Sequence, residues 1–456
     1  MQNQLQPGRP AAERLPLLFY ALLGLGVVGG CAACAALVLY SASWPEAAAL
    51  RDFYPWEPRA YTAAEFTGLR RGLAGLALAA LGLAGILSRE PAGRAQLRRL
   101  GREVASSGRG LAAGWRALPP GQQRWAGGLL LALTALRLYC STGLVPADDG
   151  VSYEVFVRAR LLVVSAAYPF PNNHVGSNTL NWLFYQLNPG FWWSMRLPVV
   201  LTSTGATGLW FLLVLRRSSF RVAALAVSLF SVLQLSLYHA VTGRGYWLLV
   251  GLGAVGFFAV LELTRPASAG PRRARAAWAG LVLSGVLGLY VVPTHGYFLF
   301  SAYSWLGLAA LRRRGAWEGL LPVLGLGGLT LLGAGLLYAP LLLISGPQPF
   351  FYNSYVLPLA VGEFWRQLPG YLWLSEGWLS GHRWLGGLPL LAALGGGGPC
   401  GGGRGPGSCP RRRPGRCCGW GRRARGLLPR PTCWWWRSGW PRPSARFFIN
   451  HCCGAC

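Results

Sequence analysis

The chain has no lysine and very little acid. All 43 basic residues are arginine, against 14 acidic residues, and the aspartates are Asp52, Asp148 and Asp149. A formal net charge of +29 is typical of nucleic-acid-binding proteins. Here, however, the arginines stand in short clusters between long apolar runs, so we exclude nucleic acid as a partner. We attribute the use of arginine alone to the codon usage of a GC-rich genome.

Charge is largely absent from long stretches of the sequence, which is 53% hydrophobic. Uncharged apolar stretches of about 20 residues cross membranes as helices. The chain is therefore predicted to be an all-α, polytopic membrane helix bundle of about 9–10 transmembrane helices. The predicted spans are 15–41, 71–88, 127–146, 197–215, 222–241, 245–264, 277–292, 296–311 and 319–345, with a broken candidate at 384–395.

The arginine clusters predict how these helices cross the membrane. Four linkers carry them: 94–116, 216–221, 265–275 and 312–314. If all four are cytoplasmic, as the positive-inside rule demands, the alternate loops face outward, and 147–196 is the largest of them. We expect a multi-pass protein of the cell (plasma) membrane, which in bacteria is the inner membrane. Asp148 and Asp149 are then outside. The first apolar block is too long for a typical signal peptide and is interpreted as an anchor.

The chain divides by composition into three parts. Residues 1–125 form an extra N-terminal segment of two spans with a basic linker, and residues 126–394 form the transmembrane core. From 395 to 456 hydrophobic periodicity is lost, and glycine, arginine, cysteine and tryptophan predominate. We interpret this tail as frameshifted or disordered. A zinc site is disfavoured because the cysteines lack paired spacing, and a basic nucleic-acid arm is the other alternative.

The outer loop begins with the acid pair and continues with two predicted surface segments. Apolar residues at helical spacing over 151–165 predict an amphipathic helix on the membrane surface. Pro169 and Pro171 end it, and a second segment begins at Asn172-Asn173-His174. A plain alternative for the acid pair is a helix cap, a position that aspartate favours.

Four elements follow one another with a common outward placement. They are the acid pair, the break at His174 between two surface helices, Arg196-Leu197-Pro198 at the next span, and Gly243-Arg244-Gly245-Tyr246 at the next outer turn. In this order they resemble the GT-C glycosyltransferases, in the branch similar to dolichyl-phosphate-mannose protein mannosyltransferases and the lipid A aminoarabinose transferase. The resemblance covers roughly residues 127–345.

The resemblance implies an enzyme, an inverting transferase that moves a hexosyl or pentosyl group from a polyprenyl-phosphate carrier. It also implies that Asp148 is the general base or orients the acceptor. The commoner family pair is Asp-Glu, so Asp149 departs from it, and its implied role is contact with a metal or the acceptor. The acceptor can be a protein, a lipid or a glycan, and membrane lipids are further partners.

Transfer from a lipid phosphate also needs cations or hydrogen-bond donors to stabilise the departing phosphate. The candidates are Arg244 and Arg196, at outer ends of predicted spans, with His174 in the outer loop and His295 at another outer turn as further donors. Each has a structural alternative, since arginine also snorkels at interfaces and a Pro-Thr-His turn can satisfy itself locally. No cofactor is required, because side chains can neutralise a monophosphate, although a divalent cation is possible.

Two other functions compete with sugar transfer. A transporter or flippase of lipid-linked or polar solutes would bury ionisable groups at mid-membrane. Arg137 and Glu262 are the main candidates for such groups in the predicted spans. A membrane scaffold without catalysis is the third hypothesis. Because polar residues collect at the outer ends of the spans instead, the sequence favours the transferase.

Overall fold

The computed structural model of the chain describes residues 16–52, 62–143, 145–169, 173–265, 273–312, 316–348 and 359–381. Contacts divide the chain into a unit of Met1–Gly396 and a second unit of Gly397–Cys456, and all described residues belong to the first. The candidate span 384–395 and the tail 395–456 lie outside the described residues.

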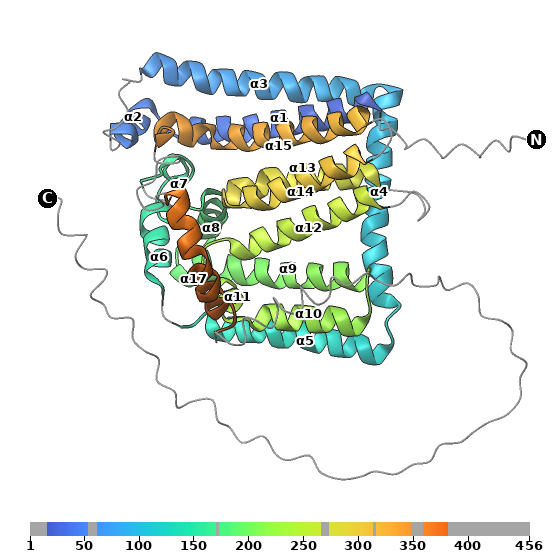
Figure 1. Ribbon diagram of the computed structural model, residues 1–456. Helices are drawn as coiled ribbons and strands as arrows, with labels where there is room; N and C mark the ends of the chain where they lie inside the picture. The colour runs from blue at the N-terminus through green and yellow to red at the C-terminus, as the bar shows by residue number, and fades with distance from the viewer. Residues whose placement is uncertain are drawn as a thin grey trace, which may run out of the picture. The chain divides into compact units, whose positions relative to one another are not determined.

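Every element of the described residues is a helix, and none of those residues forms a strand. The long helices lie side by side in Figure 1. They are α1 Leu17–Tyr40, α3 Ala63–Arg89, α5 Pro120–Cys140, α9 Leu197–Leu215, α10 Phe220–Val232, α12 Tyr246–Thr264, α13 Ala274–Val291, α14 His295–Leu311 and α15 Ala316–Ile344. Each span predicted up to residue 345 falls on these helices, except that 222–241 continues beyond the end of α10, and six of the described helices are long and apolar enough to cross a membrane. This confirms an all-α, polytopic membrane helix bundle.

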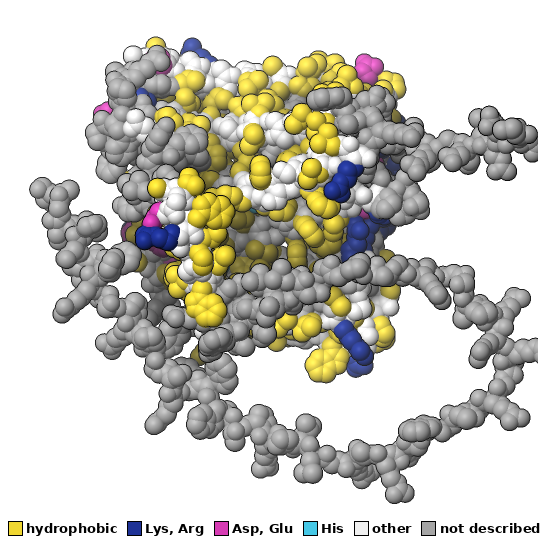
Figure 2. Space-filling view, in the orientation of Figure 1, with side chains coloured by type: hydrophobic (Ala, Val, Ile, Leu, Met, Phe, Trp, Pro, Cys, Tyr) yellow, Lys and Arg dark blue, Asp and Glu magenta, His cyan; other side chains and the backbone are white. Residues whose placement is uncertain are grey.

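The outward surfaces of these helices are apolar along their length. Leu78, Leu131 and Phe300 are 75%, 71% and 76% exposed. Figure 2 shows hydrophobic side chains over much of one face, with the basic side chains of described residues toward its two ends. Such large exposed apolar patches are rare on soluble monomers, whereas lipid tails solvate them without cost.

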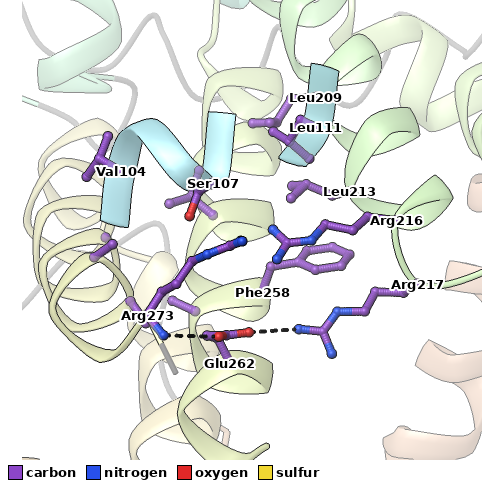
Figure 3. Close-up of a pocket in the computed structure, with 15 residues that line it drawn as sticks. Val104, Ser107, Leu111, Leu209, Leu213, Arg216, Arg217, Phe258, Glu262 and Arg273 are labelled. Carbon is purple, nitrogen blue, oxygen red and sulfur yellow. Dashed lines mark hydrogen bonds and ion pairs between the residues drawn. The ribbon is translucent and has the colours of Figure 1, made fainter. Parts of the chain in front are cut away.

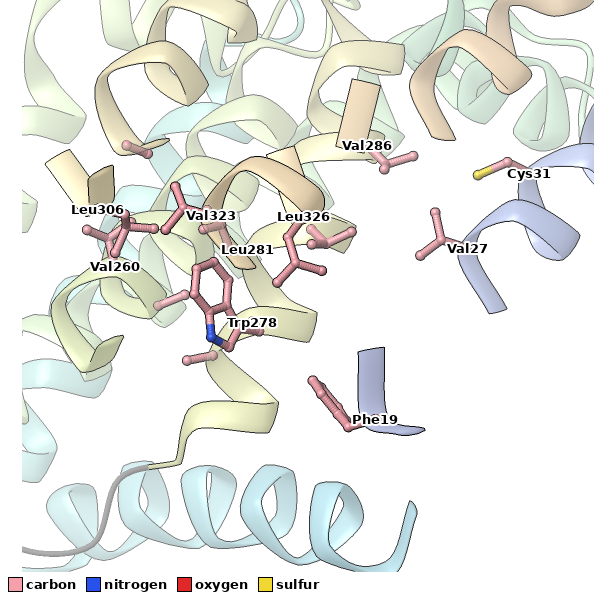
Figure 4. Close-up of a cluster of buried hydrophobic side chains, with 14 of the residues drawn as sticks. Phe19, Val27, Cys31, Val260, Trp278, Leu281, Val286, Leu306, Val323 and Leu326 are labelled. Atoms are coloured by element: carbon pink, nitrogen blue, oxygen red, sulfur yellow. The ribbon is translucent and has the colours of Figure 1, made fainter. Parts of the chain in front are cut away.

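The main core joins α1 to α12, α13, α14 and α15 (Figure 4). Trp278 and Leu281 of α13 are buried at its centre, between side chains of the neighbouring helices. Glycine lets the helices approach closely here, because a Cβ on Gly333 would lie 2.9 Å from side-chain atoms of both Val27 and Val286. Close approach through small residues is how helices pack when lipid removes the hydrophobic drive between them.

One long helix, α4 Pro91–Arg116, crosses the ends of the others (Figure 1). It packs against α1, α3, α9 and α13. Arg275 at the start of α13 anchors it, with an ion pair of 3.0 Å to Glu103 and a 3.0 Å hydrogen bond to Gln96. The linkers after α9 and before α13 also reach this side, which we call the arginine-rich end. The described arginines of the basic linkers 94–116, 216–221 and 265–275 thus share one side of the bundle, as predicted.

The other side, which we call the acid-pair end, carries a set of short helices together with α17, which has 20 residues (Figure 1). They are α2 Trp44–Asp52, α6 Ala147–Val151, η1 Ser152–Val157, α7 Leu161–Ala166, α8 Val175–Leu187, η2 Trp192–Arg196, α11 Gln234–His239 and α17 Val361–Ser380. Two of the predicted elements are divided here. The span 222–241 breaks at Leu233 into α10 and α11, and the surface segment 151–165 breaks after residue 157 into η1, a π-helix, and α7.

Candidate functional site

The acid pair meets the turn between α11 and α12 at the acid-pair end of the bundle. Asp148 and Asp149 both contact residues nearly a hundred positions along the chain, in the Gly243-Arg244 turn. His174 and Arg196 join the same cluster through contacts described below. The structure therefore assembles five of the six residues that the sequence predicts for the site, and His295 is the sixth.

Asp149 forms the buried part of the site. Its side chain is fully buried, and Oδ2 lies 2.9 Å from Nη1 of Arg196, which is also buried. The Gly243 amide donates to both carboxylate oxygens, at 3.2 Å and 3.1 Å. Burial raises the pKa of the Asp149 carboxyl, while the Arg196 charge and the Gly243 amide oppose that rise. Both oxygens are engaged within the protein, so the role of Asp149 is structural: it stabilises the turn at Gly243.

The turn that carries Arg244 is held on both sides. The carbonyl of Gly243 accepts from Nδ2 of Asn181 at 2.9 Å and from the hydroxyl of Ser177 at 3.4 Å, both on α8. Gly245 has a left-handed backbone with φ of 70°, which L-residues with side chains rarely adopt. A Cβ on Gly245 would lie 2.6 Å from Cβ of Ser177, so only glycine fits. This turn sets where the Arg244 side chain leaves the backbone.

Asp148 and Arg244 form the accessible part of the site. Their side chains make an ion pair through Nη1 and Oδ2. The Asp148 side chain is 53% exposed and that of Arg244 is 19% exposed. A carboxylate and a guanidinium thus stand together at the surface, next in sequence to Asp149 and to the Gly243 amide that Asp149 binds.

His174 orients Arg244. Its Nδ1 lies 2.7 Å from the Arg244 carbonyl oxygen, which can only accept, so Nδ1 carries the hydrogen. Its Nε2 then accepts from Nη2 of Arg244 at 3.4 Å. Burial lowers the pKa of His174 to about 4, and the Arg244 charge acts in the same direction. The imidazole is therefore neutral at pH 7 and both nitrogens are engaged, so its direct donation to a phosphate stays a prediction.

Two residues that the sequence analysis did not assign to the site, Tyr246 and His239, belong to the same cluster. The His239 ring lies 4.2 Å from the Tyr246 ring, and the His174 ring lies 5.2 Å from Tyr246 on an edge-to-face geometry. The Arg244 guanidinium carbon is 5.8 Å from the Tyr246 ring centre. Tyr246 follows the Arg-Gly element directly, and this was the available signal. His239 is brought in by the break at Leu233, which hydropathy does not reveal.

His295 lies in helix packing. Its buried ring packs against α13, where a Cβ on Gly288 would lie 2.2 Å from His295 Cδ2, and its ring centre is 5.1 Å from that of Phe298. No contact recorded for the described residues joins it to the acid pair. Its role as a donor to the phosphate stays a prediction.

A divalent cation finds few ligands in this arrangement. The described residues contain no group of three His, Cys, Asp or Glu side chains that could hold a metal ion. Of the two aspartates, Asp149 already uses both oxygens on Gly243 and Arg196. The site residues therefore do not fit a bound divalent ion, and the chemistry below uses side chains alone.

No protein-family model, no curated protein and no solved structure matches this chain. The resemblance to the GT-C glycosyltransferases therefore depends on the motif residues themselves. What the geometry offers is a surface carboxylate able to accept a proton, beside a cation with a fork of donors suited to a phosphate.

Proposed function

We propose that the protein is an integral membrane glycosyltransferase that moves a sugar from a polyprenyl-phosphate carrier to an acceptor at the outer face of the membrane. The observation that carries the proposal is the accessible pair of Asp148 and Arg244 at the acid-pair end. The buried pair of Asp149 and Arg196 supports it. A base beside a phosphate-binding cation is the minimal equipment for this reaction.

Exchange of partners would start the reaction. In the structure the Arg244 guanidinium pairs with Oδ2 of Asp148. A lipid phosphate that docks on Arg244 would take over the guanidinium, because the planar fork binds two phosphate oxygens at once. Asp148 would then exchange the guanidinium for the hydroxyl of the acceptor. Donor binding would thus switch on the base.

The transfer step balances without a further reactant. Asp148 takes the proton from the acceptor hydroxyl, and the acceptor oxygen forms a bond to the anomeric carbon of the sugar. The bond from that carbon to the phosphate oxygen breaks, and its electron pair stays on the polyprenyl phosphate, which Arg244 stabilises. Attack opposite the leaving group inverts the anomeric centre. The proton on Asp148 is then lost to solvent or to the released phosphate.

Asp149 and Arg196 serve this step as positioning residues. Both are buried, and Asp149 holds the Gly243 amide immediately before Arg244. Arg196 also donates to the carbonyl of Val241 in the same turn. Direct contact between Arg196 and the donor phosphate, which the sequence predicts, would require this buried pair to open. We therefore assign the phosphate contact to Arg244.

Transport is the second candidate, and Arg137 on α5 is the observation that favours it. This arginine is 1% exposed, and its Nη2 donates to hydroxyls of Thr207 at 2.7 Å and Ser231 at 3.2 Å. Its Nε and Nη1 have no hydrogen-bond partner in the described part of the chain. Buried ionisable groups within spans often line pathways for polar solutes. Glu262, by contrast, lies among arginines at the arginine-rich end.

One assay separates the two functions. Sealed vesicles containing the chain are given polyprenyl-phosphate donors with a labelled sugar, and products are separated into intact donor, free lipid phosphate and labelled acceptor. The chain is expressed both with its own tail and with residues 395–456 replaced by the product of the alternative reading frame. Covalent transfer that releases lipid phosphate supports the proposal. Intact labelled donor that only changes sides supports transport and contradicts it.

A further inference from the structure

A pocket of about 260 Å³ opens at the arginine-rich end, between α4, α9, α12 and α13. Its walls are largely apolar, with Leu213 of α9 and Phe258 of α12 among them (Figure 3). Arg216, Arg217 and Arg273 also line it. It stands at the end of the helices opposite the acid pair, so the proposed sugar transfer does not account for it.

Two guanidinium groups converge over this pocket. A Cβ on Gly110 of α4 would lie 3.9 Å from Cζ of Arg216 and 3.8 Å from Nη1 of Arg273. Figure 3 shows the Arg216 and Arg273 side chains pointing toward one another from opposite sides. Nη1 of Arg273 is buried and has no hydrogen-bond partner among the described residues. Two guanidinium groups this close together repel each other. An anion between them would attract both and so replace the repulsion with attraction.

The one acid that lines the pocket does not supply this anion. Glu262 accepts from the backbone amide of Arg273 at 3.2 Å and pairs with Arg217 at 3.5 Å and Arg265 at 3.7 Å. Burial lowers the pKa of Arg216, the charge of Arg273 lowers it further, and the charge of Glu262 opposes these two effects. Among the described residues that line the pocket, three arginines therefore face one glutamate, which leaves an excess of positive charge.

An apolar chamber with two converging guanidinium groups suits an anion attached to a hydrocarbon chain. The guanidinium fork matches phosphate oxygens. The position matches as well, because basic pockets between helix ends at a membrane surface hold acidic lipid headgroups. We propose that this pocket binds an anionic phospholipid, with the phosphate between Arg216 and Arg273 and an acyl chain against Leu213 and Phe258. The bound lipid would join α4 to the ends of α9 and α13.

Delipidated full-length protein in detergent, titrated with phosphatidylglycerol, tests this proposal. The readouts are the melting temperature and the bound lipid measured by mass spectrometry. We expect a saturable rise in melting temperature that phosphatidylcholine and inorganic phosphate do not produce. Losing one charged hydrogen-bond donor should weaken binding about tenfold or more in Arg273→Gln and in Arg216→Gln. Arg216 is exposed at its own position, so Arg216→Gln serves if Arg273→Gln fails to fold.

Arg221→Gln is the matched control, since Arg221 is an exposed arginine at the same end that does not line the pocket. It should bind phosphatidylglycerol like the unaltered chain. Equal responses to phosphatidylglycerol and phosphatidylcholine would overturn the proposal, as would a response to phosphate alone. It would also be overturned if Arg221→Gln weakened binding as much as Arg216→Gln, because the effect would then reflect surface charge in general.

Discussion

Asp148 and Asp149 are adjacent in the chain but have different surroundings. Neighbouring residues on a helix point in different directions, and here one carboxylate faces the surface while the other enters the protein. Asp149 is held by Arg196 and the Gly243 amide, whereas Asp148 meets Arg244 in a pair that solvent reaches. The two acids therefore contribute differently, one to the stability of the fold and the other to the accessible chemistry.

This difference can be measured by replacing each acid with its amide. Asp149→Asn leaves the buried Arg196 without its counter-charge, and breaking a buried pair in this way costs about 3–5 kcal/mol of unfolding free energy. Asp148→Asn alters a solvated pair worth about 0–1 kcal/mol. Denaturant unfolding in detergent micelles gives both values. Equal losses of unfolding free energy in the two variants would contradict the structural role assigned to Asp149.

At the residue level the sequence predicted part of the site. The rarity of aspartate and the order of the motifs identified Asp148, Asp149, His174, Arg196 and Arg244, which the structure brings together. The burial of Asp149 was not predictable, because a buried structural aspartate and an exposed base have the same side chain. The clamp of Ser177 and Asn181 on the Gly243 carbonyl was missed for a similar reason, since α8 residues meet this turn only in the folded chain.

Among the elements, the turn of residues 242–245 tolerates the fewest changes of residue type. It joins α11 to α12, presents Arg244, and is fixed by hydrogen bonds on both sides of the Gly243 peptide. The left-handed conformation at Gly245 starts α12 in the direction observed. Any side chain at that position strains the backbone and also collides with Ser177.

Gly245→Ala should therefore lower the unfolding free energy by at least about 1–2 kcal/mol, from the left-handed backbone alone. Gly253→Ala on the same helix is the control, because the nearest atom to its added Cβ is 4.0 Å away. Alanine favours a helix by up to about 1 kcal/mol over glycine, so the control should be neutral or stabilising. The same denaturant experiment compares them. A Gly245→Ala protein as stable as Gly253→Ala would contradict the turn geometry.

The surface segment shows where periodicity stops being informative. Apolar spacing over 151–165 predicts one helix, but α7 is separate and buried. Ser345, near the end of α15, donates to the Ala166 carbonyl at 2.5 Å and accepts from the Tyr168 amide at 3.1 Å. These partners lie nearly 180 residues apart in sequence, so no local pattern could announce them. The long spans were predictable because their hydropathy is a local property.

In the described unit as a whole, the two ends of the bundle differ in composition. One end carries α4 and the arginine linkers around the lipid pocket, and the other carries the acid pair and the short helices (Figure 1). The positive-inside rule predicts that the arginine-rich end is cytoplasmic. The proposed transferase site then faces outward, where a lipid-linked sugar and its acceptor would meet.

Reporter fusions test this orientation. A reporter joined after residue 110, in α4, should report the cytoplasmic side, and one joined after residue 165, in α7, should report the outer side. A fusion after residue 217, in the linker between α9 and α10, is the internal control and should agree with residue 110. The same side for 110 and 165 would overturn both the crossing pattern and the position of the site.

The central claim is that Asp148 is the base of a sugar transferase, and the most direct test is the rate of label transfer from the polyprenyl-phosphate donor. Asp148→Asn is compared with Glu154→Gln, which removes another exposed acid of the same loop, at equal amounts of folded protein in the membrane. Losing a general base should lower the rate by about 10²–10⁴-fold in Asp148→Asn and leave Glu154→Gln near the unaltered rate. Undiminished transfer by folded Asp148→Asn would contradict the account.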